Sequence, residues 1–269
     1  MKETSRSITI GLRSLIAATA LVAVGAAQAA VAPPALGGFA DYGRAGNIFE
    51  LAPSLFVQGL GNADDPVAVV GLNADLSFAD SSSGWGTGLV RLDYRVSNTG
   101  VGAFGPLRFM LFANPDGDGV AFLDTLSETW GVGGGGNPVR REAREFTTDP
   151  FSTITARFRS TSQLNEGLSA LDAACTSAGG CDAVIGLQWD APTLGPGETF
   201  HIVVGLSDNG QALSSRWIDA TSSSDPTGTT LRLSGMSQII PVPEPASAWM
   251  LAAGLALLGG AAARRRARR

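Results

Sequence analysis

Short apolar runs alternate with polar turns along the chain from Phe39 onward, and few of these runs show helical periodicity. Glycine, serine, threonine and aspartate residues separate the runs. The clearest strand covers residues 89–96, where polar and apolar side chains alternate after Leu89. Further strands are predicted at residues 107–113, 184–189, 200–206, 216–220 and 229–233. This pattern predicts an all-β fold, an Ig-like or jelly-roll-type β-sandwich, and roughly 200 residues suffice for one large core.

One short helix is predicted to interrupt the strands. Leu164, Leu168 and Leu171 recur at helical spacing, and Ser162 precedes them as a candidate N-cap. The charged stretch at residues 140–145, which comes earlier in the chain, is predicted to be a solvated face.

The N-terminal segment has the pattern of a secretory signal peptide. Basic residues come first, residues 15–24 are almost wholly apolar, and Ala27-Gln28-Ala29 supplies the small-x-small step that signal peptidase recognises. We therefore predict a signal peptide at residues 1–29, an exported β-sandwich domain at residues 30–240 and a C-terminal targeting segment at residues 241–269.

The charge of the exported part limits its partners. Without residues 1–29 and the five C-terminal arginines, the chain holds 11 basic and 23 acidic residues, a net charge of −12. Such a surface repels nucleic acid and anionic lipid, so neither is expected as a partner of this domain. Neutral glycans and divalent cations remain compatible with this charge, and solubility alone also accounts for it.

Two cysteines, Cys175 and Cys181, flank a glycine-containing turn. In an oxidising compartment such a pair predicts a disulfide, which would contribute about 2–3 kcal/mol because the loop it closes is short. The spacing differs from the two-residue redox motif, so no catalytic role is inferred.

No catalytic constellation stands out. The only histidine, His201, lies inside a predicted strand, where a residue on the sheet face is the simplest interpretation. Residues 205–210 have one residue too many for a nucleophile elbow and are better explained as a hairpin turn. The glycine run at residues 131–136 is interpreted as a flexible loop, because residues 125–130 before it do not read as a buried strand. A pair of carboxylates for glycoside hydrolysis remains an open alternative.

A partial calcium-loop pattern occurs at residues 114–119. Asn114, Asp116 and Asp118 occupy alternate positions, and glycine follows at the sixth place. The twelfth place is Thr125, which cannot supply the bidentate carboxylate of an EF-hand. A plain turn rich in Asp and Gly is therefore the favoured interpretation, with calcium as the alternative cofactor.

The C-terminal segment combines three features. Pro243, Glu244 and Pro245 are followed by uncharged residues 246–263, which are just long enough to span a membrane. A basic cluster then ends the chain: Arg264, Arg265, Arg266, Arg268 and Arg269.

This order of features resembles the PEP-CTERM sorting signal of Gram-negative bacteria, which the membrane protease exosortase handles. The resemblance implies that Pro243, Glu244 and Pro245 are the recognition motif, that residues 246–263 form a transmembrane helix which holds the protein only transiently, and that the processed protein reaches the cell surface or the medium. It also implies an association with exopolysaccharide and biofilm.

From these observations we expect an exosortase-processed surface or matrix protein that is not an enzyme and binds a glycan or matrix partner. Two alternatives remain: a secreted carbohydrate-active hydrolase using paired carboxylates, and a calcium-stabilised adhesin.

Overall fold

The computed structural model describes residues 38–41, 48–63, 74–116, 124–132, 134–146, 161–168, 182–222 and 230–241, together with Thr153, Ala156 and Phe158. The predicted signal peptide, the Cys175–Cys181 pair and residues 242–269 lie outside these ranges. Within them, no helix has the length and apolar character needed to cross a membrane.

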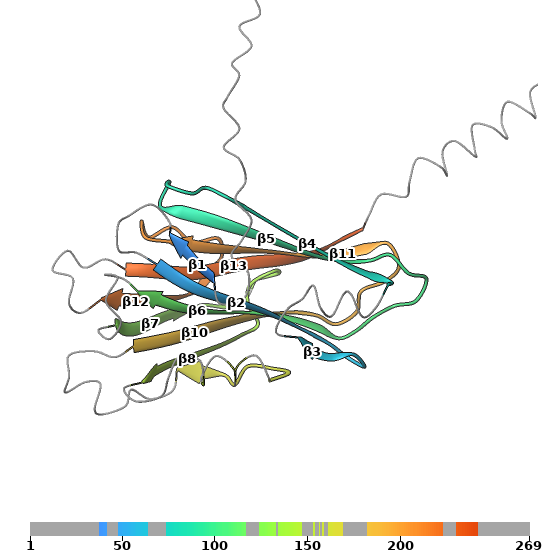
Figure 1. Cartoon of the computed structure of the whole chain (residues 1–269), viewed down its shortest axis with the longest axis horizontal. Helices are drawn as coiled ribbons and strands as arrows, with labels where there is room; N and C mark the ends of the chain where they lie inside the picture. Colours follow the sequence, from blue (N-terminus) through green and yellow to red (C-terminus); the bar gives the residue numbers. More distant parts are fainter. Residues whose placement is uncertain are drawn as a thin grey trace, which may run out of the picture.

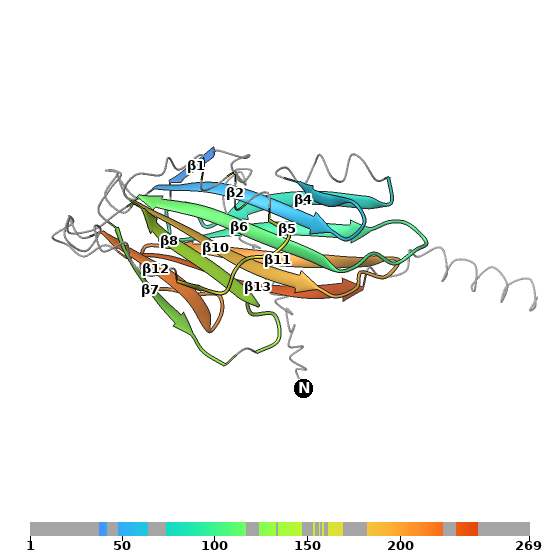
Figure 2. The same ribbon diagram turned by 90° about the horizontal axis from the view of Figure 1, so that it is seen from below.

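Two β-sheets pack face to face (Figures 1 and 2). The first sheet contains, in spatial order, β1 (Gly38–Asp41), β2 (Ile48–Val57), β6 (Leu107–Asp116), β10 (Asp182–Ala191), β8 (Arg140–Phe146) and β9 (Gly167–Leu168), and β3 (Gly61–Ala63) also pairs with β2. The second sheet contains β4 (Leu76–Ser83), β5 (Leu89–Asn98), β11 (Glu198–Ser207), β13 (Thr230–Pro241), β12 (Arg216–Ser222) and β7 (Asp124–Trp130). Every strand pair is antiparallel except β8 with β9, and the predicted β-sandwich is confirmed.

The main core lies between the two sheets, and alternation along the strands explains it. In β5, Val90, Leu92, Tyr94 and Val96 are buried, while the residues between them face outward. Tyr94 packs on Phe109 of β6 with ring centroids 4.7 Å apart, so aromatic contacts join the two sheets. All six predicted strands are present, and most extend a few residues further than predicted.

A smaller apolar cluster covers the outer face of the first sheet. Phe158 stacks on Phe112 of β6 with ring centroids 5.0 Å apart, and Leu164 is buried beside them. The amide nitrogen of Leu164 donates to Gln188 Oε1 at 2.8 Å. The predicted helix is therefore wrong over residues 161–168: Leu164 lies in an irregular segment hydrogen-bonded to side chains of the sheet, and Leu168 belongs to strand β9.

The charged stretch at residues 140–145 is not a solvated face, because it forms strand β8. Glu142 is only 3% exposed and accepts a hydrogen bond from the amide nitrogen of Asn165 at 3.1 Å. Arg141 points into the sandwich and binds the carboxylate of Glu128 on β7 with two guanidinium nitrogens. Partners from distant parts of the chain make these charged positions compatible with burial.

Residues 124–130 form strand β7 at the edge of its sheet, and none of residues 126–130 is buried, which agrees with the prediction that they are not a buried strand. One further prediction needs correction. Residues 114–116 do not turn but extend β6, paired in register with Glu50, Phe49 and Ile48 of β2.

Candidate binding cleft on the second sheet

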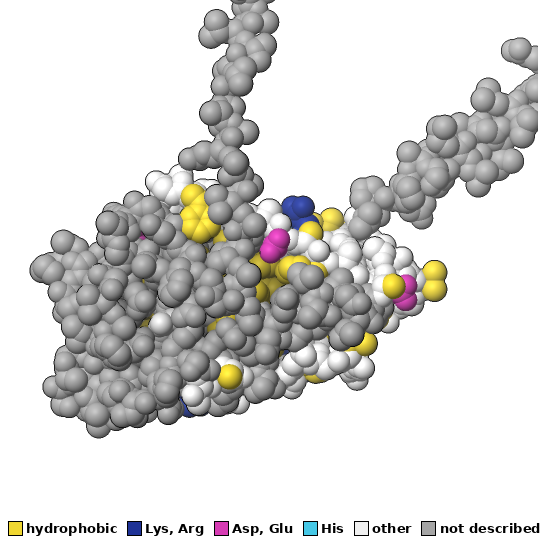
Figure 3. Space-filling model, viewed as in Figure 1, with side chains coloured by type: hydrophobic (Ala, Val, Ile, Leu, Met, Phe, Trp, Pro, Cys, Tyr) yellow, Lys and Arg dark blue, Asp and Glu magenta, His cyan; other side chains and the backbone are white. Residues whose placement is uncertain are grey.

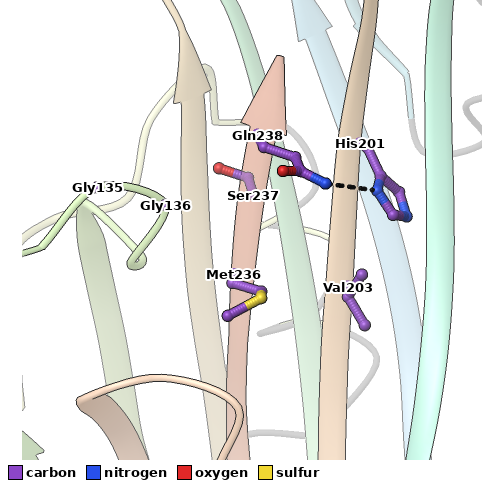
Figure 4. Close-up of a pocket in the computed structure, with 7 residues that line it drawn as sticks. All are labelled: Gly135, Gly136, His201, Val203, Met236, Ser237 and Gln238. Atoms are coloured by element: carbon purple, nitrogen blue, oxygen red, sulfur yellow. Dashed lines mark hydrogen bonds between the residues drawn. The ribbon is translucent and has the colours of Figure 1, made fainter. Parts of the chain in front are cut away.

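A cleft of about 380 Å³ opens on the outer face of the second sheet, where β11 and β13 run side by side (Figure 4). Its lining residues are Gly135, Gly136, His201, Val203, Met236, Ser237 and Gln238. Strand register explains how these residues meet, because His201 lies opposite Gln238 and Val203 lies opposite Met236. The loop that contains Gly135 and Gly136 forms the other wall.

A row of polar side chains crosses three strands at the cleft. His201 Nε2 lies 2.5 Å from Asp93 Oδ1 on β5, and Gln238 Nε2 on β13 lies 3.5 Å from His201 Nδ1. With the proton on Nε2, the ring donates to the carboxylate and can accept from the amide at Nδ1. Arg95 Nη2 also lies 3.5 Å from Asp93 Oδ1, so Asp93 holds the ring in place while its own charge is balanced.

Apolar surface adjoins this polar row. Val203 and Met236 face each other from neighbouring strands, and the Met236 side chain is 48% exposed (Figure 4). An aliphatic floor beside fixed hydrogen-bonding groups suits a ligand with both hydroxyl groups and C–H surface.

The glycine-rich wall is built on backbone pairing. The amide nitrogen of Ser237 donates to the carbonyl oxygen of Gly136 at 2.7 Å, so the loop lies beside β13 beyond the end of β12. Gly136 has a φ of +87°, and a Cβ there would lie 2.5 Å from the carbonyl oxygen of Ser237. Gly135, by contrast, has no heavy atom of the described residues within 4 Å of its Cβ position. Position 135 therefore tolerates a side chain that would project beside the cleft.

Two arginines fix the base of this loop on Trp130. The guanidinium groups of Arg141 and Arg216 lie 4.5 and 4.7 Å from the Trp130 ring centroid. Arg216 donates to the carbonyl oxygens of Gly131 and Pro138, at 3.0 and 2.8 Å, and so ties the two ends of the loop together. The hydrogen bonds that Arg141 donates to Glu128 raise the pKa of Arg141 above its ordinary value despite partial burial, so this cation persists.

The described residues around His201 do not reproduce a nucleophile–base pair. Asp93 contacts His201 as the aspartate of a catalytic triad contacts its histidine. The other imidazole nitrogen, however, faces the amide of Gln238 and not a nucleophile. Within the described part of the chain, no hydroxyl group forms a hydrogen bond with His201. Ser207, which precedes the bend at residues 208–210, is buried and donates to Asn209. That bend is present as predicted, but it does not form a hairpin, because β13 lies between β11 and β12.

The sequence-predicted site residues lie elsewhere. Asn114 and Asp116 fall within β6, and Asp118 lies outside the described residues. Among the side chains that the structure describes, no three His, Cys, Asp or Glu residues gather as a metal site. Calcium binding at residues 114–119 and the Cys175–Cys181 disulfide both stay predictions.

The chain leaves the second sheet at Pro241, which pairs with Glu198 as the last residue of β13. A family model for the PEP-CTERM protein-sorting motif matches residues 241–266, beginning at that same residue. The chain carries a PEP-CTERM sorting motif. The motif indicates a protein targeted to exosortase, which exports it to the cell surface or the extracellular space. The predicted recognition residues Pro243, Glu244 and Pro245 fall inside the match.

The rest of the PEP-CTERM protein has no match among curated proteins or solved structures. Its cleft therefore has to be interpreted from its own residues. Sequence analysis missed that cleft because Asp93, His201 and Gln238 form no local motif, and His201 lies 108 residues from Asp93 in the chain.

Proposed function

We propose that this exosortase substrate is a non-enzymatic surface or matrix protein, and that its β-sandwich binds exopolysaccharide in the cleft between β11, β13 and the glycine-rich loop. The observation that carries the proposal is the Asp93–His201–Gln238 row on a chain with an export signal. During sorting the C-terminal segment holds the protein in the membrane, and processing then releases the domain.

The chemistry of the cleft fits a neutral sugar. The Gln238 amide keeps its oxygen and one N–H beyond its contact with His201, and Ser237 adds a hydroxyl group, so both lining residues can pair with sugar hydroxyls. Met236 and Val203 offer apolar contact for the C–H face of a sugar ring. Because strands rather than loops carry these side chains, little conformational entropy would be lost on binding.

The carboxylates on this sheet face support binding rather than hydrolysis. Asp93 is paired with His201 and Arg95, and Asp219 accepts two hydrogen bonds from Arg232, at 2.7 and 2.8 Å. An acid–base pair for glycoside cleavage needs one carboxyl group that holds a proton. Both carboxylates are instead already engaged by protein side chains.

The decisive experiment compares two glycine-to-leucine variants of the released chain, which we take to run from Ala30 to Glu244. Gly135→Leu places a side chain beside the cleft, whereas Gly102→Leu places one in equally open space at the end of β5. Both glycines lack the positive φ that penalises a side chain. Binding to exopolysaccharide purified from the producing strain should fall strongly in Gly135→Leu and stay unchanged in Gly102→Leu.

A second variant tests the polar row. Gln238→Ala removes one hydrogen-bonding group from an exposed position and should weaken binding about 2- to 10-fold, the value of one hydrogen bond. Equal affinity in the unmodified chain, Gly135→Leu and Gln238→Ala would show that the polysaccharide does not use this cleft. Release of sugar fragments by the unmodified chain would favour the hydrolase alternative.

A further inference from the structure

The end of the sandwich from which the sorting motif emerges has two acidic residues beside it, the exposed Asp75 next to Gly100 and Glu198 opposite Pro241, and otherwise consists of uncharged segments. Four segments form it, namely residues 58–60, 99–103 and 192–197 and the last residues of β13, 239–241. Strand pairing places them together, because Val57 and Ala191 both pair with Leu107, and Glu198 pairs with Pro241. None of these residues is charged, although 16% of the chain is. We call these four segments the sorting end.

Aliphatic side chains project from the sorting end. Val101 is 98% exposed, and Leu60, Ile239 and Ile240 are 36–43% exposed. In Figure 3 hydrophobic side chains are visible at this end of the molecule, close to where the C-terminal segment departs. Single exposed aliphatic residues are common on proteins, but four of them around one chain exit, without a charged neighbour in the same segments, form a contact surface.

The tether to the membrane is short. Four residues lie between Pro241, the last residue of the sheet, and Ala246, where the predicted apolar span begins, which makes five Cα-to-Cα steps. A fully extended chain covers about 3.3–3.6 Å per residue, so this tether reaches at most about 18 Å. Crossing the lipid headgroup layer uses roughly 5–8 Å of that reach. The sorting end is thus held within about 10–13 Å of the headgroups.

We propose that, while the sorting segment occupies the membrane, the sorting end rests on the extracytoplasmic phospholipid surface, with Val101, Leu60, Ile239 and Ile240 in contact with the headgroup layer. This inference uses the membrane-residence step of the proposed function and is independent of polysaccharide binding. The geometry favours lipid over a protein partner, because the tether length alone brings these side chains to the bilayer.

The test uses the full chain inserted in phosphatidylcholine vesicles that carry a fraction of phosphatidylcholine with a nitroxide on its headgroup. The chain holds four other tryptophans, so insertion is measured as the quenching that the unmodified chain shows in excess of Trp249→Phe, which assigns it to Trp249 inside the predicted span. The quenching of each added indole is likewise taken relative to Trp249→Phe. In a Trp249→Phe background, Val101→Trp then places an indole at the sorting end, and Gln211→Trp places one on an exposed position after β11, at the opposite end. Strands of about ten residues keep these two positions roughly 30 Å apart.

The expected result is nitroxide quenching of the added indole in Val101→Trp and none in Gln211→Trp. If Trp249 is quenched but the indole of Val101→Trp is not, the domain does not touch the bilayer. The lipid contact is then refuted, while membrane residence and the proposed function stand. Equal quenching at both positions would mean that the domain lies on its side, which also overturns it. An unquenched Trp249 would contradict membrane residence itself, and with it that step of the proposed function.

A variant in cells separates lipid from protease as the occupant of this surface. If Val101→Trp shows no quenching in protein-free vesicles while Val101→Asp prevents C-terminal trimming in the native host, exosortase rather than lipid contacts the sorting end. That outcome would refute the lipid contact.

Discussion

The hydroxyl group of Tyr94 should destabilise the folded domain, and its removal is expected to stabilise it. Tyr94 is 1% exposed, and its ring packs on Phe109. Its hydroxyl is buried and has no hydrogen-bond partner among the described residues. Burial of an unsatisfied polar group costs about 1–3 kcal/mol. Tyr94→Phe keeps the ring and removes this cost, so the free energy of unfolding should rise by about 1 kcal/mol or more, or about 2–4 °C in Tm per kcal/mol.

Alkaline pH should enlarge the difference. Burial, with a smaller contribution from the nearby charge of Asp80, raises the pKa of Tyr94 well above its ordinary value of about 10. Above about pH 10, the ordinary pKa, the unfolded chain loses the phenol proton while the folded chain keeps it. The stability contribution of the protonated phenol is thus fully present below about pH 10 and falls by about 1.4 kcal/mol for each further pH unit. Tyr94→Phe should lack this fall.

Urea denaturation of the released chain at neutral pH and at two alkaline values measures both effects. The matched control is Tyr42→Phe, which removes the only other tyrosine. Ultraviolet absorbance of the phenolate shows directly whether Tyr94 ionises only on unfolding. If Tyr94→Phe is less stable than the unmodified chain at neutral pH and loses stability equally fast at alkaline pH, the hydroxyl is hydrogen-bonded in the folded state and the reasoning is wrong.

Two further variants test the packing between the sheets. Gly235→Ala puts a Cβ 2.5 Å from Trp189 Cζ2 and should lower the free energy of unfolding by about 1–3 kcal/mol in a urea titration; a neutral effect would mean that the Trp189 ring can shift. Arg141→Met leaves the carboxylate of Glu128 partly buried without its partner and should cost about 1–3 kcal/mol, of which Arg141→Met with Glu128→Gln should recover a part. A double variant no more stable than the single one would show that the cost comes from the lost contact of Arg141 with Trp130 and not from the unpaired carboxylate.

The strands that the sequence predicts correctly are those whose two faces differ. In β5, arginine and aspartate point outward and aliphatic residues inward, so alternation alone is sufficient. Strand β8 is hidden by its composition, because Arg141 faces the core and its partner Glu128 belongs to another strand. Strand β4 is equally hard to recognise, since its serine-rich second half is mostly exposed at the edge of the sheet.

Local spacing misleads where distant contacts decide the structure. Leu164 fits a helical repeat in the sequence. In the structure its side chain is buried against the outer face of the first sheet, and its amide nitrogen donates to the Gln188 side chain instead of to a helix carbonyl. The cleft also depends on contacts between distant parts of the chain. Only the register of β5, β11 and β13 brings Asp93, His201 and Gln238 into one row. The sorting motif, in contrast, is contiguous in the chain, and therefore its sequence alone identifies it.

The position of β13 determines how the domain responds to mechanical force. Any pull on the C-terminal segment acts on a central strand, paired with β11 from Arg232 to Pro241 and flanked on its other side by β12. Because such a pull runs along the strand, it loads the backbone hydrogen bonds in shear, so they must break together rather than one after another. Cleft residues His201 and Gln238 lie on this same strand pair. A pulling force between a polymer bound in the cleft and the cell membrane would therefore act through β11 and β13 alone, and the other strands would carry little of it.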